Sequence, residues 1–280
     1  MALKLEVVLT KLKLLDERRA MDPIKQFEKQ VDENIQRLGE KAELSRLSLE
    51  WMLQTGIAGD YTYNFKWLGR PIIQYPQDIV AMQELVWEVK PDLIIETGIA
   101  HGGSLIMNAS YLAMLEYCEA VESGKLLDPS KPKRKVLGID IDVREHNRKA
   151  IEAHPMAMRI DMIQGSSIDS NIIEQVHEYA KDYKLILISL DSNHTHEHVL
   201  KELEAYAQLT SIGSYCLVYD TAIEGMPEAL CANRPWGPGD SPKTAVWEYL
   251  KKHPEFEIDK SIENKLLITV APDGYLKRVR

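Results

Sequence analysis

The sequence predicts an α/β fold with a mainly parallel sheet and helices on both of its faces. Short apolar runs alternate with segments of helical periodicity along most of the 280 residues, which is typical of βαβ units. The apolar runs lack a period of two, as expected for strands that are covered on both faces. A glycine-rich turn and several carboxylates follow these runs, where ligands bind in open α/β sheets.

Residues 1–56 are rich in Leu, Glu, Lys and Arg and predict an N-terminal helical extension, in which Pro23 opens a helix. This extension is expected to form an oligomer contact or to cap the main domain, with substrate gating as the alternative. The main domain is assigned to residues 57–280. Its first part is a predicted loop whose aromatic side chains either pack inward or line a ligand site; they are Tyr61, Tyr63, Phe65, Trp67 and Tyr75.

Five strands and six helices are expected in the main domain, followed by a C-terminal antiparallel hairpin. The strands are predicted at 93–96, 136–140, 158–164, 185–190 and 215–219. The helices are predicted at 77–89, 104–121, 144–153, 170–180, 196–208 and 243–252, with a surface loop at 122–134. The hairpin is predicted from residues 258–262 and 266–270.

Composition excludes several classes of protein. A formal net charge of -9 argues against general binding of nucleic acid or of an anionic membrane surface. No apolar run approaches a membrane span of about 18 residues, and charged residues interrupt any signal-peptide pattern. Three cysteines without C-x-x-C spacing predict neither a disulfide framework nor a zinc ribbon. A cytoplasmic protein is expected.

The turn after the first strand contains Gly98, Gly102 and Gly103. It would let the backbone approach a ligand closely and would direct helix N–H groups toward it; a purely structural tight turn is the alternative. The G-x-x-x-G-G spacing differs from the G-x-G-x-x-G fingerprint, which disfavours an NAD enzyme. Asp140 ends the second strand, where a carboxylate can bind ribose hydroxyls. Its alternative role is a helix cap, for which Asp142 is the better candidate.

Asp191 and Asp220 end the fourth and fifth strands, so their carboxylates can converge on a magnesium ion. Two helix caps are the alternative. His194 follows Asp191 by three residues and could take a proton from a substrate hydroxyl held on the metal. A zinc or iron site made of His194, His196 and His198 is disfavoured, because helix positions i and i+2 point to different sides.

Several ordered motifs resemble the cephalosporin hydroxylase family, from about residue 61 to the C-terminus. They are Trp67-Leu68-Gly69-Arg70-Pro71-Ile72-Ile73-Gln74, Pro91 to Gly98 with Gly102-Gly103-Ser104, Gly138-Ile139-Asp140, Leu190 to His194 with His198-Val199, and Arg234 to Gly239. Residues 1–56 lie outside this resemblance.

The resemblance implies a Rossmann-like class I methyltransferase fold and O-methylation of sugar or natural-product hydroxyls with S-adenosylmethionine. The implied cofactor contacts are Glu96, Gly98, His101, Gly102, Gly103, Ser104, Asp140, Ser167 and Asp191. It further implies a magnesium site at Asp191 and Asp220. Where family members have a Glu-Asp pair, this chain has Tyr219-Asp220, so Thr221 or water would complete the site. Catechol-type enzymes place a lysine base three residues after the Asp, which supports His194, with Asp191, as the catalytic pair.

The expected function is therefore magnesium-assisted, S-adenosylmethionine-dependent O-methylation of a small-molecule or glycan acceptor, by a protein that forms a homo-oligomer. A segment rich in Pro and Gly, residues 225–242, is expected to close over the acceptor as a lid that includes Trp236. One alternative is a non-catalytic cofactor-binding or scaffold protein. An iron and 2-oxoglutarate hydroxylase is disfavoured, because His194-x-His196 offers no carboxylate at i+2 and the βαβ pattern does not fit.

Overall fold

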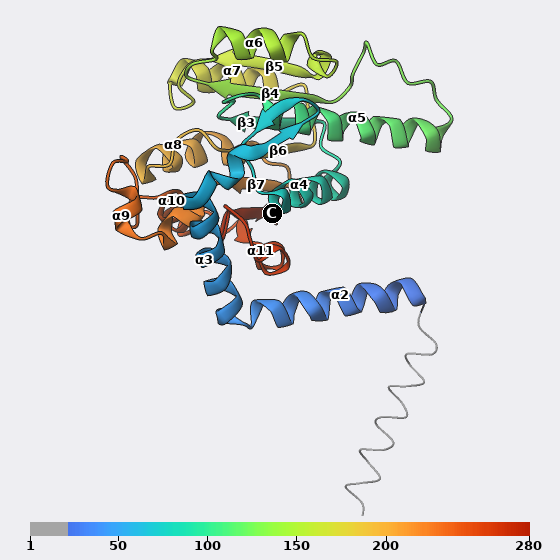
Figure 1. The fold of residues 1–280 in the computed structure, drawn as a ribbon. Helices are drawn as coiled ribbons and strands as arrows, with labels where there is room; N and C mark the ends of the chain where they lie inside the picture. Colours follow the sequence, from blue (N-terminus) through green and yellow to red (C-terminus); the bar gives the residue numbers. More distant parts are fainter. Residues whose placement is uncertain (1–21) are drawn as a thin grey trace, which may run out of the picture.

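The computed structural model describes residues 22–280, and the part of the predicted extension before residue 22 lies outside this range. A seven-stranded sheet forms the centre, in the order β5-β4-β3-β6-β7-β9-β8 (Figure 1). Its strands are β3 (Leu93–Thr97), β4 (Lys135–Asp140), β5 (Ile160–Gln164), β6 (Ile186–Leu190), β7 (Tyr215–Val218), β8 (Phe256–Ile258) and β9 (Tyr275–Arg278). The five strands from β3 to β7 are parallel.

Helices cover both faces of this sheet. One face packs on α4 (Pro76–Val89), α5 (Gly103–Ser123), α6 (Glu145–Glu152) and α11 (Lys260–Leu266), and the other on α7 (Ser170–Ala180), α8 (His196–Tyr206) and α10 (Pro242–Leu250). Successive strand residues serve opposite layers: Ile94 packs in the first, whereas Leu93 and Ile95 pack in the second. Because both faces are buried, the central strands β3, β6 and β7 are mainly apolar, without a period of two. The predicted fold class is confirmed.

The strand order fixes where a ligand can bind. From the central pair β3 and β6, the chain proceeds outward through β4 and β5 on one side and through β7 on the other. The connections therefore diverge at the carboxyl ends of β3 and β6. In open α/β sheets this divergence leaves a crevice for ligands.

The C-terminal hairpin was predicted in the wrong place. An antiparallel pair exists, but it joins β8 to β9, and residues 260–266 form α11 between them. The Asp259 side chain accepts the backbone N–H of Ser261 and so begins a helix where a strand was expected. Residues 266–270 do not form a strand, because the buried Asp78 carboxylate accepts both the Thr269 hydroxyl and the backbone N–H of Val270.

Two helices precede the main domain, α2 (Pro23–Gly39) and α3 (Ala42–Gly59). Pro23 is the first residue of α2, as predicted, and the Asp22 side chain accepts the backbone N–H of Ile24 at 2.9 Å. Helix α3 packs on the body through Ser48 and Met52, and α2 runs below it with Gly39 against the Asn264 side chain of α11 (Figure 1). No helix within residues 22–280 is both long and apolar enough to cross a bilayer.

The segment predicted as an aromatic loop contains a short hairpin of β1 (Phe65–Trp67) and β2 (Arg70–Ile72), after the 3-10 helix η1 (Tyr61–Asn64). Its turn residues, Leu68 and Gly69, both have positive φ, as tight hairpin turns require. The Trp67 indole donates to the Ser110 hydroxyl at 3.0 Å, and Arg70 donates to the His101 carbonyl at 3.1 Å. The hairpin is thereby fixed beside the glycine turn.

Candidate active site

A cavity of about 260 Å³ lies beyond the carboxyl ends of β3, β4, β6 and β7. Most of the predicted cofactor residues line it: Gly98, His101, Gly103, Ser104, Asp140 and Asp191. Ser167 lines an adjoining cavity of about 100 Å³, which shares Gly98, Asp140 and Ser192 with the first. Glu96 and Gly102 lie behind the turn rather than on the cavity surface.

Close backbone packing explains the glycines of the turn. Gly98 has φ +89°, and a Cβ there would overlap the Asp191 carbonyl oxygen. A Cβ at Gly103 would overlap the Pro71 carbonyl oxygen, which belongs to the β1–β2 hairpin. The turn thus brings the ends of β3 and β6 and the hairpin together around one cavity, which only residues without a side chain allow.

Glu96 supports the turn from behind. Its side chain is buried and accepts hydrogen bonds from Ser104 and from the Asn108 amide, the latter at 2.8 Å. Burial raises the pKa of Glu96 to about 8 despite these two donors. Since Ser104 also lines the cavity, Glu96 acts on it indirectly, by orienting the first turn of α5.

Asp140 faces both cavities and also holds the turn. Its Oδ2 accepts the backbone N–H of Ile99 at 2.8 Å, and its Oδ1 accepts that of Asp142 at 3.0 Å. The expectation that Asp142 caps the next helix is wrong, because the N-cap of α6 is Arg144 and has no side-chain hydrogen bond. The Asp140 carboxylate is therefore fixed in position before any ligand enters.

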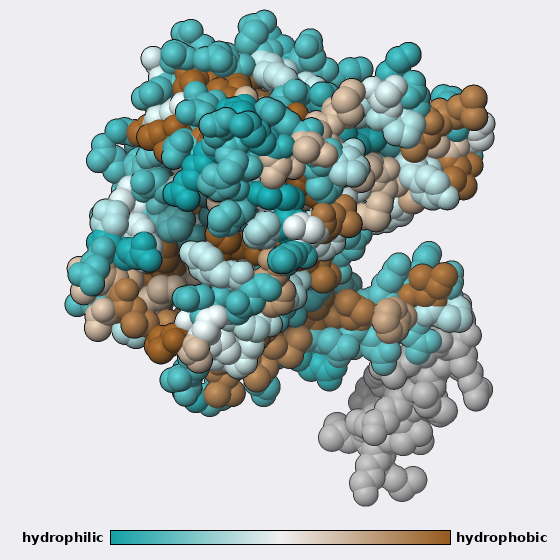
Figure 2. Space-filling view, turned by 45° about the horizontal axis from the view of Figure 1, so that its top comes forward, coloured by the Kyte–Doolittle hydropathy of each residue, from teal (hydrophilic) through white to brown (hydrophobic). Residues whose placement is uncertain are grey.

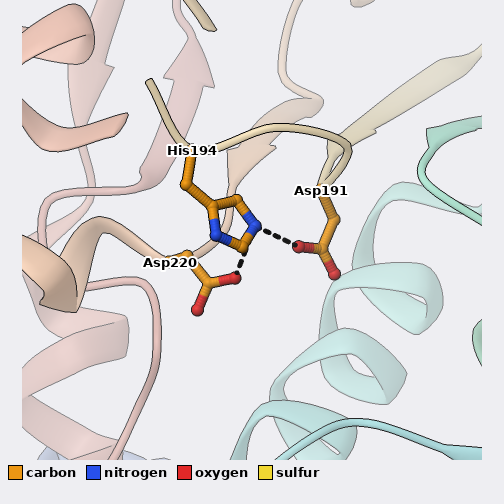
Figure 3. A group of neighbouring side chains, drawn as sticks. All are labelled: Asp191, His194 and Asp220. Atoms are coloured by element: carbon orange, nitrogen blue, oxygen red, sulfur yellow. Dashed lines mark ion pairs between the residues drawn. The ribbon is translucent and has the colours of Figure 1, made fainter. Parts of the chain in front are cut away.

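Asp191, His194 and Asp220 converge at the mouth of the same cavity (Figure 3). The His194 Nε2 atom lies 3.0 Å from Asp220 Oδ2 and 3.8 Å from Asp191 Oδ1. One ligand atom from each residue lies within 4.8 Å of the other two. Two carboxylates and an imidazole at this spacing fit a divalent cation, and carboxylate oxygens are the protein ligands that magnesium prefers.

The pKa values of Asp191 and His194 are shifted by burial and by neighbouring charges. Removal from bulk water raises the pKa of Asp191, and the nearby Asp220 carboxylate adds to this effect. For His194 the same removal from water favours the neutral form, but the charges of Asp220 and Asp191 outweigh it and raise the pKa to about 9. A cation between these carboxylates would cancel that attraction and favour neutral imidazole, the form that accepts a proton.

Comparison with known proteins agrees with this geometry. A family model described as Rhamnosyl O-methyltransferase/CmcI matches residues 59–279. The chain belongs to this family. The resemblance inferred from the sequence motifs is thereby confirmed, and with it the expected enzyme class, an O-methyltransferase.

Relatives and solved structures extend the comparison. Rhamnosyl O-methyltransferase of Mycobacterium tuberculosis (strain H37Rv) is 32% identical over 206 residues, which is 72% of this chain and 73% of the relative. That of Mycobacterium leprae is 28% identical over 225 residues, 79% and 86% of the two chains. A CmcI structure with magnesium and S-adenosylmethionine has a TM-score of 0.51 at 19% identity and covers 78% of each chain. A CmcI structure with S-adenosylhomocysteine has a TM-score of 0.52 at 19% identity, over 79% and 85%. These structures show the shared fold.

Neither of the residues next to Asp220 in the sequence reaches the cluster that Asp220 forms with Asp191 and His194. Tyr219 is buried in the core layer of α4 and α5, and burial raises the pKa of its phenol, so a metal-binding phenolate is disfavoured. The Thr221 hydroxyl donates to the Pro272 carbonyl at 2.7 Å and is fully buried. This geometry gives no support to Thr221 as a replacement ligand. The atom that lies between the two carboxylates is His194 Nε2.

The other two histidines of the motif point elsewhere, as their spacing predicted. His196 bonds to the Thr244 hydroxyl at 2.8 Å and lies 3.2 Å from Glu248. His198 lies within 3.1 Å of Ser167 and 3.2 Å of Ser192, on the side of the smaller cavity. A three-histidine metal site does not form.

Sequence reasoning missed several residues that line the cavity. Thr62, Gln74 and Val270 line it, as does Tyr63 from the aromatic segment, for which a ligand role was one of two open alternatives. The Trp236 ring lies 5.5 Å from the His194 ring, centroid to centroid. The segment expected to act as a lid thus reaches the cluster, and the aromatic composition of residues 56–77 was the available signal for Tyr63.

Proposed function

We propose that this O-methyltransferase transfers a methyl group from S-adenosylmethionine to a sugar hydroxyl, with magnesium held by Asp191 and Asp220. The observation that carries the proposal is the meeting of Asp191, His194 and Asp220 in the cavity that also contains the glycine turn and Asp140. CmcI structures with magnesium and S-adenosylmethionine, and with S-adenosylhomocysteine, support the choice of both ligands.

The residues that line the cavity would have separate roles in cofactor binding, proton removal and exclusion of water. The glycine turn and Asp140 would hold S-adenosylmethionine, with Asp140 on the ribose hydroxyls. Bound magnesium supplies Lewis acidity that lowers the pKa of an acceptor hydroxyl. His194 would take the proton from that hydroxyl, because its Nε2 lies between the two carboxylates. Trp236 would exclude water from the same side, which favours attack on the sulfonium methyl group.

A sugar acceptor is supported by the names of the relatives, which are rhamnosyl O-methyltransferases. We choose a rhamnoside as the first acceptor to test for that reason. The non-catalytic scaffold alternative rested on the tyrosine at position 219 and on the long N-terminal helical region. Asp191 and Asp220 converge without an acidic residue at position 219, which supports a metal site in this chain.

The test is isothermal titration of S-adenosylmethionine, with and without magnesium, into wild type, Asp140→Ala and Asp142→Ala. Asp142 is the control, because it is exposed and lines neither cavity. We expect Asp140→Ala to weaken binding at least about tenfold and Asp142→Ala to bind like wild type. Absence of binding to the wild type under both conditions would reject the proposed function.

We also infer that the protein forms a homo-oligomer through α2 and resides in the cytoplasm. Helix α2 buries none of its side chains, and Ile24 and Phe27 are exposed on it. Figure 2 shows apolar surface on the arm that leads to the grey residues. Light scattering of wild type and Phe27→Asp tests the homo-oligomer. A monomeric wild type would contradict it.

The cytoplasmic assignment is supported by three unpaired cysteines.

A further inference from the structure

A buried carboxylate lies behind the candidate active site and lines neither of its cavities. It belongs to Asp78, in the first turn of α4, and only 2% of this residue is exposed. The carboxylate accepts the Thr269 hydroxyl, the backbone N–H of Val270 at 3.1 Å and the Tyr275 hydroxyl at 2.8 Å. Two of these donors lie in the loop between α11 and β9, so Asp78 ties this loop to α4.

The burial of this carboxylate is unfavourable unless hydrogen bonds replace the water that it loses. Burial raises the pKa of Asp78 to about 6, and the three donors limit this rise. The side chain is therefore mainly ionised at neutral pH, and an ionised carboxylate accepts hydrogen bonds at both oxygens. Thr269 and Tyr275 bond to Oδ1, whereas the N–H of Val270 bonds to Oδ2. Both oxygens are used, which fixes the backbone of the loop relative to α4.

The same loop contacts the two residues that follow Asp220 in the sequence. The Val270 carbonyl accepts the backbone N–H of Ala222 at 3.0 Å. The Pro272 carbonyl accepts the hydroxyl of Thr221, which is fully buried, at 2.7 Å. The chain that leaves the metal cluster is thus anchored at two successive residues to a loop that the buried carboxylate holds.

The backbone conformation of Asp220 makes this anchorage important. Its φ of +57° lies in the left-handed region, which is unfavourable for a residue with a side chain. On one side, the N–H of Tyr219 bonds to the Leu190 carbonyl at 3.0 Å and holds the chain to β6. On the other side, the contacts with the loop hold it. Without them, Asp220 would be free to return to negative φ, and its carboxylate would leave its position 3.0 Å from His194 Nε2.

We propose that Asp78 is a positioning residue for Asp220. Through the loop between α11 and β9, it holds Asp220 in the left-handed conformation that directs its carboxylate toward His194. The proposal rests on the proposed function and adds to it a residue that contacts neither the cofactor nor the acceptor. Loss of Asp78 should therefore weaken metal binding. It should leave S-adenosylmethionine binding unchanged, because other contacts hold the glycine turn and Asp140.

Binding of Mn²⁺, which prefers the same oxygen ligands as magnesium, tests the proposal. Electron paramagnetic resonance of the free ion gives its dissociation constant. Asp78→Ala removes every acceptor of the loop and should weaken Mn²⁺ binding at least about tenfold. Thr269→Val removes one bond from the loop and should weaken it about threefold. Tyr275→Phe is the matched control, because it removes a bond to the same carboxylate from β9 and not from the loop. It should bind Mn²⁺ within about twofold of wild type.

Stability and cofactor binding are measured on the same samples. Urea denaturation should show similar shifts of the midpoint in Thr269→Val and Tyr275→Phe, since each loses a bond to the same carboxylate. A difference in Mn²⁺ affinity between these two variants then reports positioning and not a general loss of stability. Titration of S-adenosylmethionine should give the wild-type affinity in all three variants.

Hydrogen exchange tests the anchorage without any metal. The amide of Ala222 should exchange faster in Asp78→Ala and Thr269→Val than in wild type, and at the wild-type rate in Tyr275→Phe. Unchanged Mn²⁺ affinity in both loop variants, or equal weakening in Tyr275→Phe and Thr269→Val, would overturn the proposal. If Asp78→Ala does not fold, Thr269→Val supplies the result. If the wild type binds no Mn²⁺, the metal site of the proposed function fails. The exchange rate of Ala222 then decides the role of Asp78, and an unchanged rate refutes it.

Discussion

The two sides of the active site are constructed differently. On the proposed cofactor side, the residues lie at the end of a strand of one parallel sheet or shortly after it, as Gly98, Asp140 and Asp191 do. On the proposed acceptor side, Thr62, Gln74 and Val270 come from a 3-10 helix and two loops that are far apart in sequence. The first kind of site is encoded by local motifs. The second exists only because separate segments pack together.

The largest effect is expected where the two sides meet, at Asp220. Asp220→Asn keeps the shape but removes a charge from the cluster of Asp191, His194 and Asp220, so turnover of a rhamnoside acceptor should fall by about a hundredfold or more. Affinity for S-adenosylmethionine should change little. The measurement is release of S-adenosylhomocysteine, with the exposed Asp182→Asn as the control. Turnover equal to wild type would remove Asp220 from the mechanism.

The cofactor side should be intolerant of any side chain at residue 98. Gly98→Ala places a Cβ against the Asp191 carbonyl and imposes an unfavourable positive φ, so the free energy of unfolding should fall by about 3 kcal/mol. Gly59→Ala, where a Cβ meets open space, should change it by less than about 1 kcal/mol. Urea denaturation measures both, and similar losses in the two variants would contradict the steric explanation.

Buried Glu96 should make stability depend on pH. Its pKa is about 8 in the folded protein and near the ordinary value of 4.5 in the unfolded chain. The folded state therefore holds a proton that the unfolded state releases, so this contribution is complete below about pH 4.5 and declines until about pH 8. Glu96→Gln should flatten that decline by about 3 kcal/mol between pH 5 and 8. The exposed Glu122→Gln serves as the control, and an unchanged profile in Glu96→Gln would refute the assignment.

The smallest effect is expected from the segment predicted as a lid. Trp236→Ala removes the ring beside His194, so the KM for a rhamnoside acceptor should rise by roughly fivefold to tenfold. The free energy of unfolding should stay within about 1 kcal/mol of wild type, because Trp236 is only partly buried. Trp87→Ala, at an exposed position on α4, should leave KM unchanged. A KM equal to wild type in Trp236→Ala would show that the segment does not contact the acceptor.

Much of the cofactor side could be predicted from sequence because it depends on the sheet alone. Apolar runs identified β3 to β7, and the residue after each run identified Asp140, Asp191 and Asp220. The errors arose where side chains compete with local propensity. Asp259 begins a helix in the predicted hairpin, and Asp78 holds Thr269 away from any strand. The β1–β2 hairpin was also missed, because its only strong local signal is Gly69 in the turn.

The sequence by itself determined the layered α/β fold, the glycine turn and the carboxylates at the strand ends. Strand periodicity and the order of residues after each strand are local properties, so they survive without knowledge of distant contacts. The tertiary structure alone decided that His194 Nε2 lies between two carboxylates and that Thr62, Gln74 and Val270 line the same cavity as the glycine turn. Both depend on packing between segments distant in sequence, which no local pattern encodes.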